Sequence, residues 1–289
     1  MAKEFRVVVA TDGSPVARAA VAAAVEFPWP ANSQASGVLA RAPLPATADL
    51  TPTVWAAIGQ SLERVAAEAR RTLRRRWPDA EVAVLDKLPA DAILAEARGA
   101  QAIVLGSRGH GVVGRLLLGS VSRQVVRSAT CPTLVVKGSA RGFQHFVIGV
   151  DGSANSRRAA AFVALLERPR GARVTLVAVV EPVRVGSMGL MPAGIRATLG
   201  REMRAMSAER VRRAQRQLHA AARPLARAGW RVRTAVRTGL PLTELTAAAE
   251  AGDVLVVGAR GVGGVERLLL GSIAEGVLTR SQVPVVIVR

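Results

Sequence analysis

The chain has 289 residues, half of them hydrophobic, which is enough for two domains of ordinary size that each bury a core. Its single cysteine, Cys131, excludes an internal disulfide, and no apolar run approaches the ~18 residues of a membrane span. Asp12 interrupts the first apolar stretch, which excludes a secretory signal. We therefore expect a cytoplasmic protein in which Cys131 is a buried, inert thiol.

The formal net charge of +19 comes almost wholly from arginine and is uneven along the chain. Residues 1–139 contain 17 basic and 11 acidic side chains, and the remainder contains 23 and 10. Such an excess favours contact with polyanions. The arginine run at 74–76, however, has no interleaved aromatic residues to stack on bases, and we interpret it as a solvated helix face. Weak, nonspecific polyanion binding is one alternative function.

The predicted elements alternate between strand and helix. In the first half, strands are predicted over 5–11, 36–42, 80–86, 101–106 and 132–137, with helices over 15–26, 53–77, 89–98 and 120–128. In the second half, strands are predicted over 144–150, 172–180, 230–237, 253–258 and 284–288. Alternation of this kind predicts parallel sheets with right-handed crossovers, and the scarcity of aromatic residues fits strands buried on both faces.

The two halves are copies of one pattern. Residues 5–14 read FRVVVATDGS and residues 146–153 read FVIGVDGS, so each first strand ends in Asp-Gly-Ser. Residues 104–120 read VLGSRGHGVVGRLLLGS and residues 256–272 read VVGARGVGGVERLLLGS. A repeat fixes the architecture before any single motif is judged. It predicts two domains, 1–138 and 144–289, with extra length in the second around 183–228.

The second repeated segment has the spacing G-x2-G-x9-G-S between a strand and a helix. Glycines allow close backbone approach, and the N–H groups at a helix N-terminus attract anions, so the segment fits a phosphate chain. Ser120 and Ser272 are expected to cap these helices or donate to phosphate, and Arg108 and Arg260 to offset its charge. Neither copy contains GxxxxGK[ST] or GxGxxG after a first strand, which excludes a P-loop and disfavours nicotinamide-type binding.

The aspartates that follow the two first strands, Asp12 and Asp151, could accept hydrogen bonds from ribose hydroxyls. A strand order of 3-2-1-4-5 makes strands one and four neighbours, so that Asp12 faces Gly106 and Asp151 faces Gly258. The alternative for both aspartates is capping of the first helix.

On these motifs the chain resembles the ATP-binding type of universal stress protein, twice over. The resemblance implies the adenine nucleotide alpha hydrolase-like fold: an α/β class with tandem five-stranded parallel sheets of order 3-2-1-4-5 and helices on both faces. It also implies ATP as ligand, with or without Mg²⁺, and a role as a nucleotide-dependent regulator or sensor in stress response. The implied site of the first copy is Asp12, Ala40, Gly106, Ser107, Arg108, Gly109, Gly119, Ser120, Val121 and Ser122. The implied site of the second copy is Asp151, Val179, Gly258, Ala259, Arg260, Gly261, Gly271, Ser272 and Ile273.

The copies depart from the family pattern at different places. An acidic residue usually opens the fourth strand; it is present as Asp253 but replaced by Gln101. A hydroxyl often follows two positions after Gly-Ser; it is present as Ser122 but lost at Ala274, so we expect the first site to hold a triphosphate better.

Catalysis has little support in the sequence. A weak ATPase is a further alternative, yet no general base is duplicated, because the counterpart of His110 is Val262. We expect no catalytic or metal-binding residues. The resemblance also predicts that the last strands pair the copies as a pseudo-dimer, and that whole chains form a homodimer.

Overall fold

The computed structural model describes residues 4–43, 51–109, 118–137, 142–182, 193–261 and 270–289. The first copy contains β1 (Phe5–Thr11), α1 (Pro15–Glu26), β2 (Ser33–Ala40), α2 (Pro52–Leu73), β3 (Val82–Leu85), α3 (Pro89–Glu96), β4 (Ala102–Gly106), α4 (Ser120–Ser128) and β5 (Thr133–Val136). The second copy contains β6 (His145–Gly149), α5 (Ala154–Leu165), β7 (Arg173–Val180), α6 (Ala193–Arg227), β8 (Arg231–Thr238), α7 (Pro241–Ala247), β9 (Asp253–Gly258), α8 (Ser272–Arg280) and β10 (Val285–Val288).

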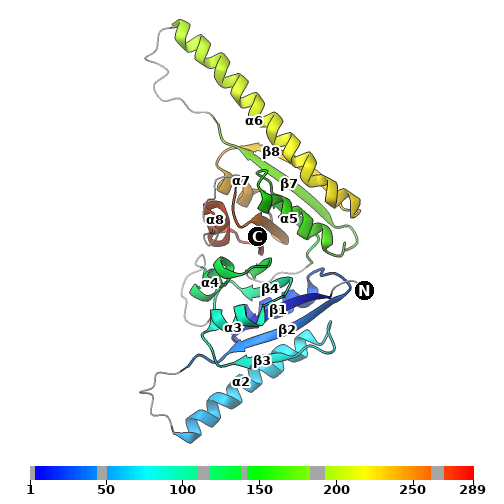
Figure 1. Ribbon diagram of the computed structural model, residues 1–289, viewed down its shortest axis with the longest axis vertical. Helices are drawn as coiled ribbons and strands as arrows, with labels where there is room; N and C mark the ends of the chain where they lie inside the picture. Colours follow the sequence, from blue (N-terminus) through cyan, green and yellow to red (C-terminus); the bar gives the residue numbers. More distant parts are fainter. Residues whose placement is uncertain (1–3, 44–50, 110–117, 138–141, 183–192, 262–269) are drawn as a thin grey trace.

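All ten strands belong to one sheet, in the order β3-β2-β1-β4-β5-β10-β9-β6-β7-β8 (Figure 1). The predicted order 3-2-1-4-5 is therefore confirmed in both copies. Within a copy every pairing is parallel, whereas β5 and β10 pair antiparallel, with Val135 opposite Val285 and Thr133 opposite Ile287. The predicted pairing of the copies through their last strands is present, and it merges two sheets into one mixed sheet. Neither last strand remains as an edge.

Helices cover both faces of this sheet, as predicted. Side chains alternate along each strand, so Val7 and Val9 of β1 join one apolar layer while Val8 joins the other. The first layer also contains buried residues of α1, α2, α5 and α6, and the second contains those of α3, α4, α7 and α8. Each layer is continuous across the two copies.

The extra length of the second copy lies in α6, a helix of 35 residues whose N-terminal part extends away from the sheet (Figure 1). Its C-terminal part packs on the sheet through Ala214, Leu218 and Leu225. The helix α2 of the first copy ends at Leu73, four residues earlier than expected. Residues 74–76 form a turn after the helix, and the Trp77 N–H is bonded to the Leu73 carbonyl (3.0 Å).

Aromatic residues are few, and most of them gather where the two copies meet. The Phe27 ring lies 4.4 Å from Trp29, 5.1 Å from Phe143 and 5.9 Å from Phe146, measured between ring centroids. Phe146 in turn packs edge-on against Trp230 at 5.5 Å. Since Phe27 and Trp29 belong to the first copy and Phe146 and Trp230 to the second, this cluster ties the two halves together.

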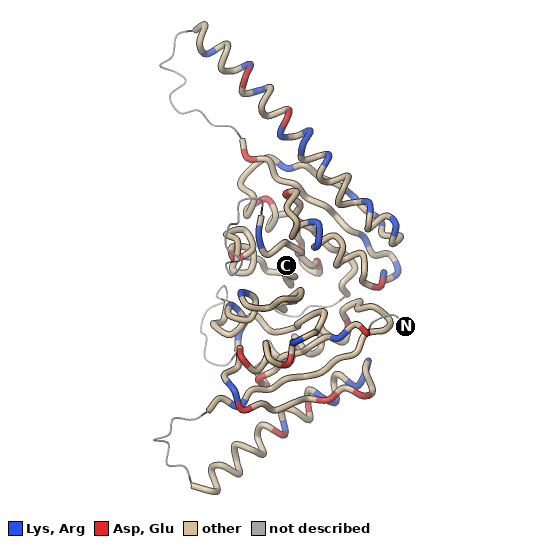
Figure 2. Tube along the Cα trace, in the orientation of Figure 1, with Lys and Arg blue, Asp and Glu red and all other residues tan. Residues whose placement is uncertain are grey.

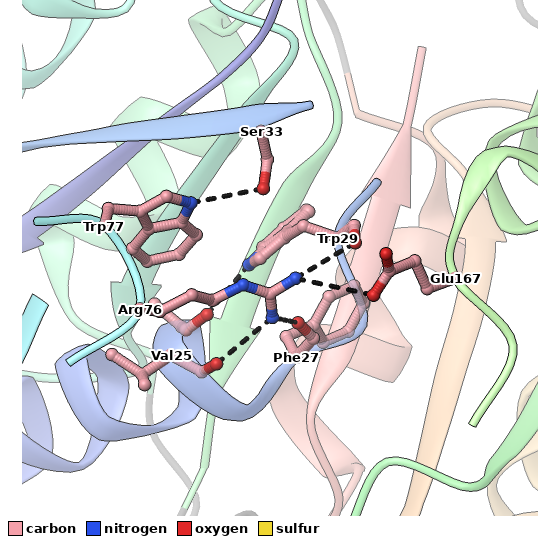
Figure 3. A network of polar contacts seen from close by, with 8 residues as sticks. Val25, Phe27, Trp29, Ser33, Arg76, Trp77 and Glu167 are labelled. Atoms are coloured by element: carbon pink, nitrogen blue, oxygen red, sulfur yellow. Dashed lines mark hydrogen bonds and ion pairs between the residues drawn. The ribbon is translucent and has the colours of Figure 1, made fainter. Parts of the chain in front are cut away.

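Arg76 is part of the same contact (Figure 3). Its guanidinium donates to the backbone carbonyls of Val25 (3.1 Å), Phe27 and Trp29 (3.0 Å), and lies 3.9 Å from a carboxylate oxygen of Glu167 in the second copy. Burial lowers the pKa of Arg76, while the Glu167 charge acts against this shift. The interpretation of 74–76 as a solvated helix face is thus wrong for Arg76.

Figure 2 shows basic residues at many places along the described chain. Many of them lie along α6 and on β8, where Arg213, Arg223, Arg231 and Arg233 are exposed. In the described part of the chain no helix is long and apolar enough to cross a membrane. Cys131 is buried as expected, and burial raises the pKa of its thiol to about 11.

Candidate functional site

A cavity of about 320 Å³ opens at the carboxyl ends of β1, β2 and β4. Its walls include these predicted site residues of the first copy: Asp12, Ala40, Gly106, Arg108, Gly109, Gly119, Ser120, Val121 and Ser122. Ser107 does not line it. That residue is buried, its N–H donates to the Val136 carbonyl (2.9 Å), and its carbonyl accepts from the Gly119 N–H (2.8 Å). Ser107 therefore closes the base of the glycine loop.

The Asp-Gly-Ser turn after β1 sets the position of Asp12. Gly13 has φ of 76°, a value that favours glycine, and the Asp12 carboxylate accepts from the Ser14 N–H at 2.9 Å. The N-cap of α1 is Ser14, whose Oγ accepts from the Ala17 N–H (3.1 Å). In the second copy Ser153 caps α5 in the same way. The alternative that the two aspartates cap these helices is therefore wrong.

Each glycine pair lies between an aspartate and a helix. A Cβ added to Gly109 would overlap Oδ2 of Asp12, and one added to Gly261 would lie 2.6 Å from Oδ2 of Asp151. The expectation that Asp12 faces Gly106 needs correction. Gly106 is the last residue of β4 and packs under α1, where an added Cβ would lie 3.1 Å from the Val16 carbonyl oxygen. The carboxylate meets the second glycine of the pair, not the first.

The helices α4 and α8 begin at these loops without a side-chain cap. Their N-cap residues are Gly119 and Gly271, and neither N-terminus has a capping side-chain hydrogen bond. Ser120 and Ser272 are the first helical residues and do not cap, which corrects one of their two expected roles. An uncapped helix N-terminus presents backbone N–H donors and a partial positive charge, and at the Ser120 end these lie at the cavity.

Ser122 has a structural bond that the sequence did not reveal. Its Oγ is buried and donates to the Gly106 carbonyl at 2.8 Å, which joins the first turn of α4 to the end of β4. The hydroxyl proton is thus directed at the backbone, not outward into the cavity. Ala274, the counterpart in the second copy, is buried against the apolar layer.

The second copy has the same backbone frame with different side-chain ties. The Gly271 N–H donates to the Ala259 carbonyl (2.8 Å), as Gly119 does to Ser107. The Arg260 carbonyl accepts from Ser153 Oγ (3.2 Å) and from the Asn155 amide (3.4 Å). The first copy has Val16 at the position of Asn155, and the valine side chain cannot donate a hydrogen bond to the loop carbonyl.

Other site residues of the second copy follow their first-copy counterparts. Val179, near the end of β7, and Ile273, in the first turn of α8, are partly buried against the same apolar layer as Ala40 and Val121. Gln217 of α6 lies against Gly152, where the first copy has Val65 against Gly13. The second site is therefore more polar beside its Asp-Gly-Ser turn.

The difference between Gln101 and Asp253 does not involve the glycine loops. Asp253 begins β9, lies 2.9 Å from Nδ1 of His145 and accepts from the Glu250 N–H at 2.8 Å. Gln101, just before β4, accepts from the N–H of Arg6 in the neighbouring strand β1 (2.7 Å). Both side chains join the amino ends of adjacent strands, whereas the cavity lies at the carboxyl ends.

Several wall residues were missed by sequence reasoning. Pro89 and Ile93 of α3, with Val38 of β2, form an apolar side of the cavity. They carry no polar signal and are separated from the glycine motif in sequence. His110 and Val262 lie outside the described residues. Among the described residues no three His, Cys, Asp or Glu side chains gather as a metal site.

Comparisons with known proteins identify the family of this chain. The family model described as "Universal stress protein family" matches residues 5–137 and again 142–289. A universal stress protein of Mycobacterium tuberculosis is 31% identical over 202 residues, which are 66% of this chain and 62% of that protein. One of Mycolicibacterium smegmatis is 31% identical over 212 residues, covering 69% and 65%. The match thus spans less than two thirds of either relative's length.

A solved structure shows the same architecture at full length. A universal stress protein of Archaeoglobus fulgidus superposes with a TM-score of 0.68 over 98% of both chains, at 20% identity. Together with the double match to the family model, this superposition shows that both copies have the same fold as that protein. The chain belongs to the universal stress protein family and consists of two of its domains in tandem.

Proposed function

We propose that this chain binds adenine nucleotide, ATP above all, at the carboxyl end of the strands in each copy, and that bound nucleotide regulates it in a stress response. The observation that carries the proposal is the juxtaposition at the cavity of a carboxylate, a bare glycine backbone and an uncapped helix N-terminus. Asp12, Gly109 and Gly119 supply these three features. A ribose needs the first, and a phosphate chain needs the other two.

The parts of a nucleotide map onto different walls of the cavity. The apolar wall of Val38 and Ile93, with the end of β2 at Ala40, suits a flat base held by backbone groups. Asp12 suits the ribose hydroxyls. The glycine loop and the first turn of α4 suit the phosphates, with Arg108 at the same wall to offset their charge. A volume of about 320 Å³ falls within the range of small-molecule sites.

The same frame in the second copy supports a second, unequal site. Asp151 and Gly261 repeat the close approach of carboxylate and glycine, and α8 repeats the uncapped N-terminus. The Arg260 carbonyl is tied to α5, and Gln217 adds a polar group beside the turn. We expect the two sites to differ in affinity, with the first preferred by the triphosphate.

Calorimetric titration of ATP into nucleotide-stripped protein tests the proposal. We expect binding at up to two sites, weakened by Asp12→Asn at one and by Asp151→Asn at the other. The matched control is Asp79→Asn, which makes the same change of charge at an exposed position away from the cavity. Absence of binding at millimolar ATP, or equal affinity in all three variants and the unmodified protein, would contradict the proposal.

A further inference from the structure

Each copy's last strand ends in a cation beside its own glycine loop. In the first copy Gly106 pairs with Val136, and the Ser107 N–H donates to the Val136 carbonyl, so the next residue, Lys137, lies alongside Ser107 and the loop. In the second copy Gly258 pairs with Val288, and Arg289 follows in the same way. The register of parallel strands thus places Lys137 near Arg108, and Arg289 near Arg260.

Both cations reach across to the opposite copy, because β5 and β10 are antiparallel neighbours. Lys137 Nζ donates to the Ser281 carbonyl at 2.8 Å, and Ser281 is the C-cap of α8. Arg289 donates to the Val126 carbonyl (3.3 Å) and to the Arg127 carbonyl, both in the last turn of α4. A cation at a helix C-terminus completes carbonyls that lack an intrahelical partner and matches the helix dipole.

The helices that these cations reach begin at the other copy's loop. The helix α8 runs from Gly271, in the second glycine loop, to Ser281 beside Lys137. The helix α4 runs from Gly119, in the first loop, to the turn contacted by Arg289. A continuous set of contacts therefore leads from each loop, through its neighbouring cation, along a rigid helix to the other loop.

We propose that Lys137 is a positioning residue that couples anion binding at the first glycine loop to the second copy: the anion favours the ammonium form of Lys137, which is the stronger donor to the carbonyl that ends α8. This inference rests on the proposed function, since it takes the nucleotide phosphates as the anion. Arg289 makes the equivalent contact for the second loop with a group that stays charged throughout the working pH range.

The environment of Lys137 makes this coupling measurable. Burial, and to a lesser extent the positive charge of Arg108, lower the pKa of Lys137 to about 8. The surrounding elements also carry Arg280 and Glu275 on α8, Arg123 and Arg127 on α4, and Arg289 after β10, with Arg127 paired to Glu275 at 3.0 Å. A phosphate beside Arg108 offsets the repulsion that Arg108 exerts. Binding therefore raises the pKa of Lys137, and the protein takes up protons as the anion binds.

The sign of the pH dependence follows from the charge. Lys137 is protonated below about pH 8 and attracts the anion there, whereas above that pH the attraction is lost. ATP affinity at the first loop should fall roughly 2.5- to fivefold as the pH rises from about 7 to about 9, for a shift of ~0.5–1 unit on binding. The terminal phosphate of ATP loses its last proton at about pH 7, so its contribution is confined to the lower end of this interval and is the same for every Lys137 variant.

The experiment is calorimetry of ATP binding to the full chain at several pH values, each in two buffers of different ionisation enthalpy. An Asp151→Asn background weakens the second site and isolates the first. We expect net proton uptake per bound ATP near pH 8 and the fall in affinity stated above. Lys137→Met should abolish the uptake and flatten the profile. Lys137→Arg should bind at the highest pH as tightly as at neutral pH, also without uptake.

Lys87→Met is the matched control for Lys137→Met, because Lys87 is exposed and each variant replaces one lysine with methionine. It should keep the uptake of the unmodified protein. Proton uptake that is absent from the unmodified protein, or that persists in Lys137→Arg, would overturn the inference even where Lys137→Met fails to fold. Absence of ATP binding at every pH would instead refute the proposed function, so the two failures are distinguishable.

Discussion

The close approach of Gly109 to Asp12 gives the sharpest prediction about the site. Gly109→Ala adds a methyl group where Asp12 Oδ2 now lies, and in the second copy the same change at Gly261 starts from a separation of 2.6 Å. Carbon and oxygen do not approach closer than about 3.0 Å without displacement. The carboxylate therefore has to move. The backbone at Gly109 does not have the positive φ that disfavours alanine, so the substitution adds no backbone strain.

The magnitude follows from the bonds that the displaced carboxylate would lose. A hydrogen bond to a charged group contributes about 1.5–3 kcal/mol, so losing one ribose contact weakens binding roughly ten- to 150-fold. The folded state should lose up to about 2 kcal/mol, because Asp12 is exposed but its carboxylate also accepts from the Ser14 N–H at 2.9 Å.

The assay is ATP titration of Gly109→Ala beside urea unfolding of the same protein. Gly59→Ala is the control, since an alanine Cβ there meets nothing within 4 Å in α2. It should leave ATP affinity unchanged and stabilise the helix by up to about 1 kcal/mol. Affinity of Gly109→Ala within twofold of the unmodified protein, at unchanged stability, would refute a nucleotide contact by Asp12.

Three further predictions concern stability and reactivity. Arg76→Met removes half-buried hydrogen bonds to backbone carbonyls and should lower the free energy of unfolding, measured in urea, by about 2–4 kcal/mol. The control Arg75→Met, at an exposed position, should change that free energy by less than about 0.5 kcal/mol. Equal effects of the two changes would argue against the network of Figure 3. Ser122→Ala leaves the buried Gly106 carbonyl without this 2.8 Å bond and should cost about 1–2 kcal/mol, so unchanged unfolding would show that the bond contributes nothing. Because burial raises the pKa of Cys131 to about 11, its labelling by iodoacetamide at about pH 8 should be roughly 100-fold slower in folded than in unfolded protein; rapid labelling of the folded chain would contradict this.

The contact between the copies is more extensive than strand pairing alone. The aromatic cluster around Phe27 and Phe146, the Arg76 network and the bonds of Lys137 and Arg289 all cross it. Both apolar layers continue through it. We therefore expect the two copies to unfold as one cooperative unit.

Much of this protein was readable from the sequence because the informative features are local. The duplicated Asp-Gly-Ser turns and G-x2-G-x9-G-S loops each lie within a short segment, and glycine or a short polar side chain is needed there whatever the rest of the chain does. Alternation of strand and helix, with the repeat, predicted a parallel sheet in each copy, and the resemblance to universal stress proteins supplied the order 3-2-1-4-5. The strand ends then brought Asp12 and the glycine loop to one cavity, as expected.

Tertiary structure alone decided what depends on partners distant in the chain. Whether an arginine is solvated or buried depends on neighbours that its own helix does not specify, so Arg76 was misassigned while it bonds to residues about 50 positions away. Ser122 has a hydroxyl that could bind phosphate, yet this hydroxyl donates its hydrogen bond to the Gly106 carbonyl, because α4 starts directly beside the end of β4. Asp253 was predicted to open its strand, but its contact with His145 at the start of β6 depends on the pairing of β6 with β9. The crossing of Lys137 and Arg289 between copies follows from the antiparallel join of β5 and β10, a contact between residues about 150 positions apart that no local pattern encodes.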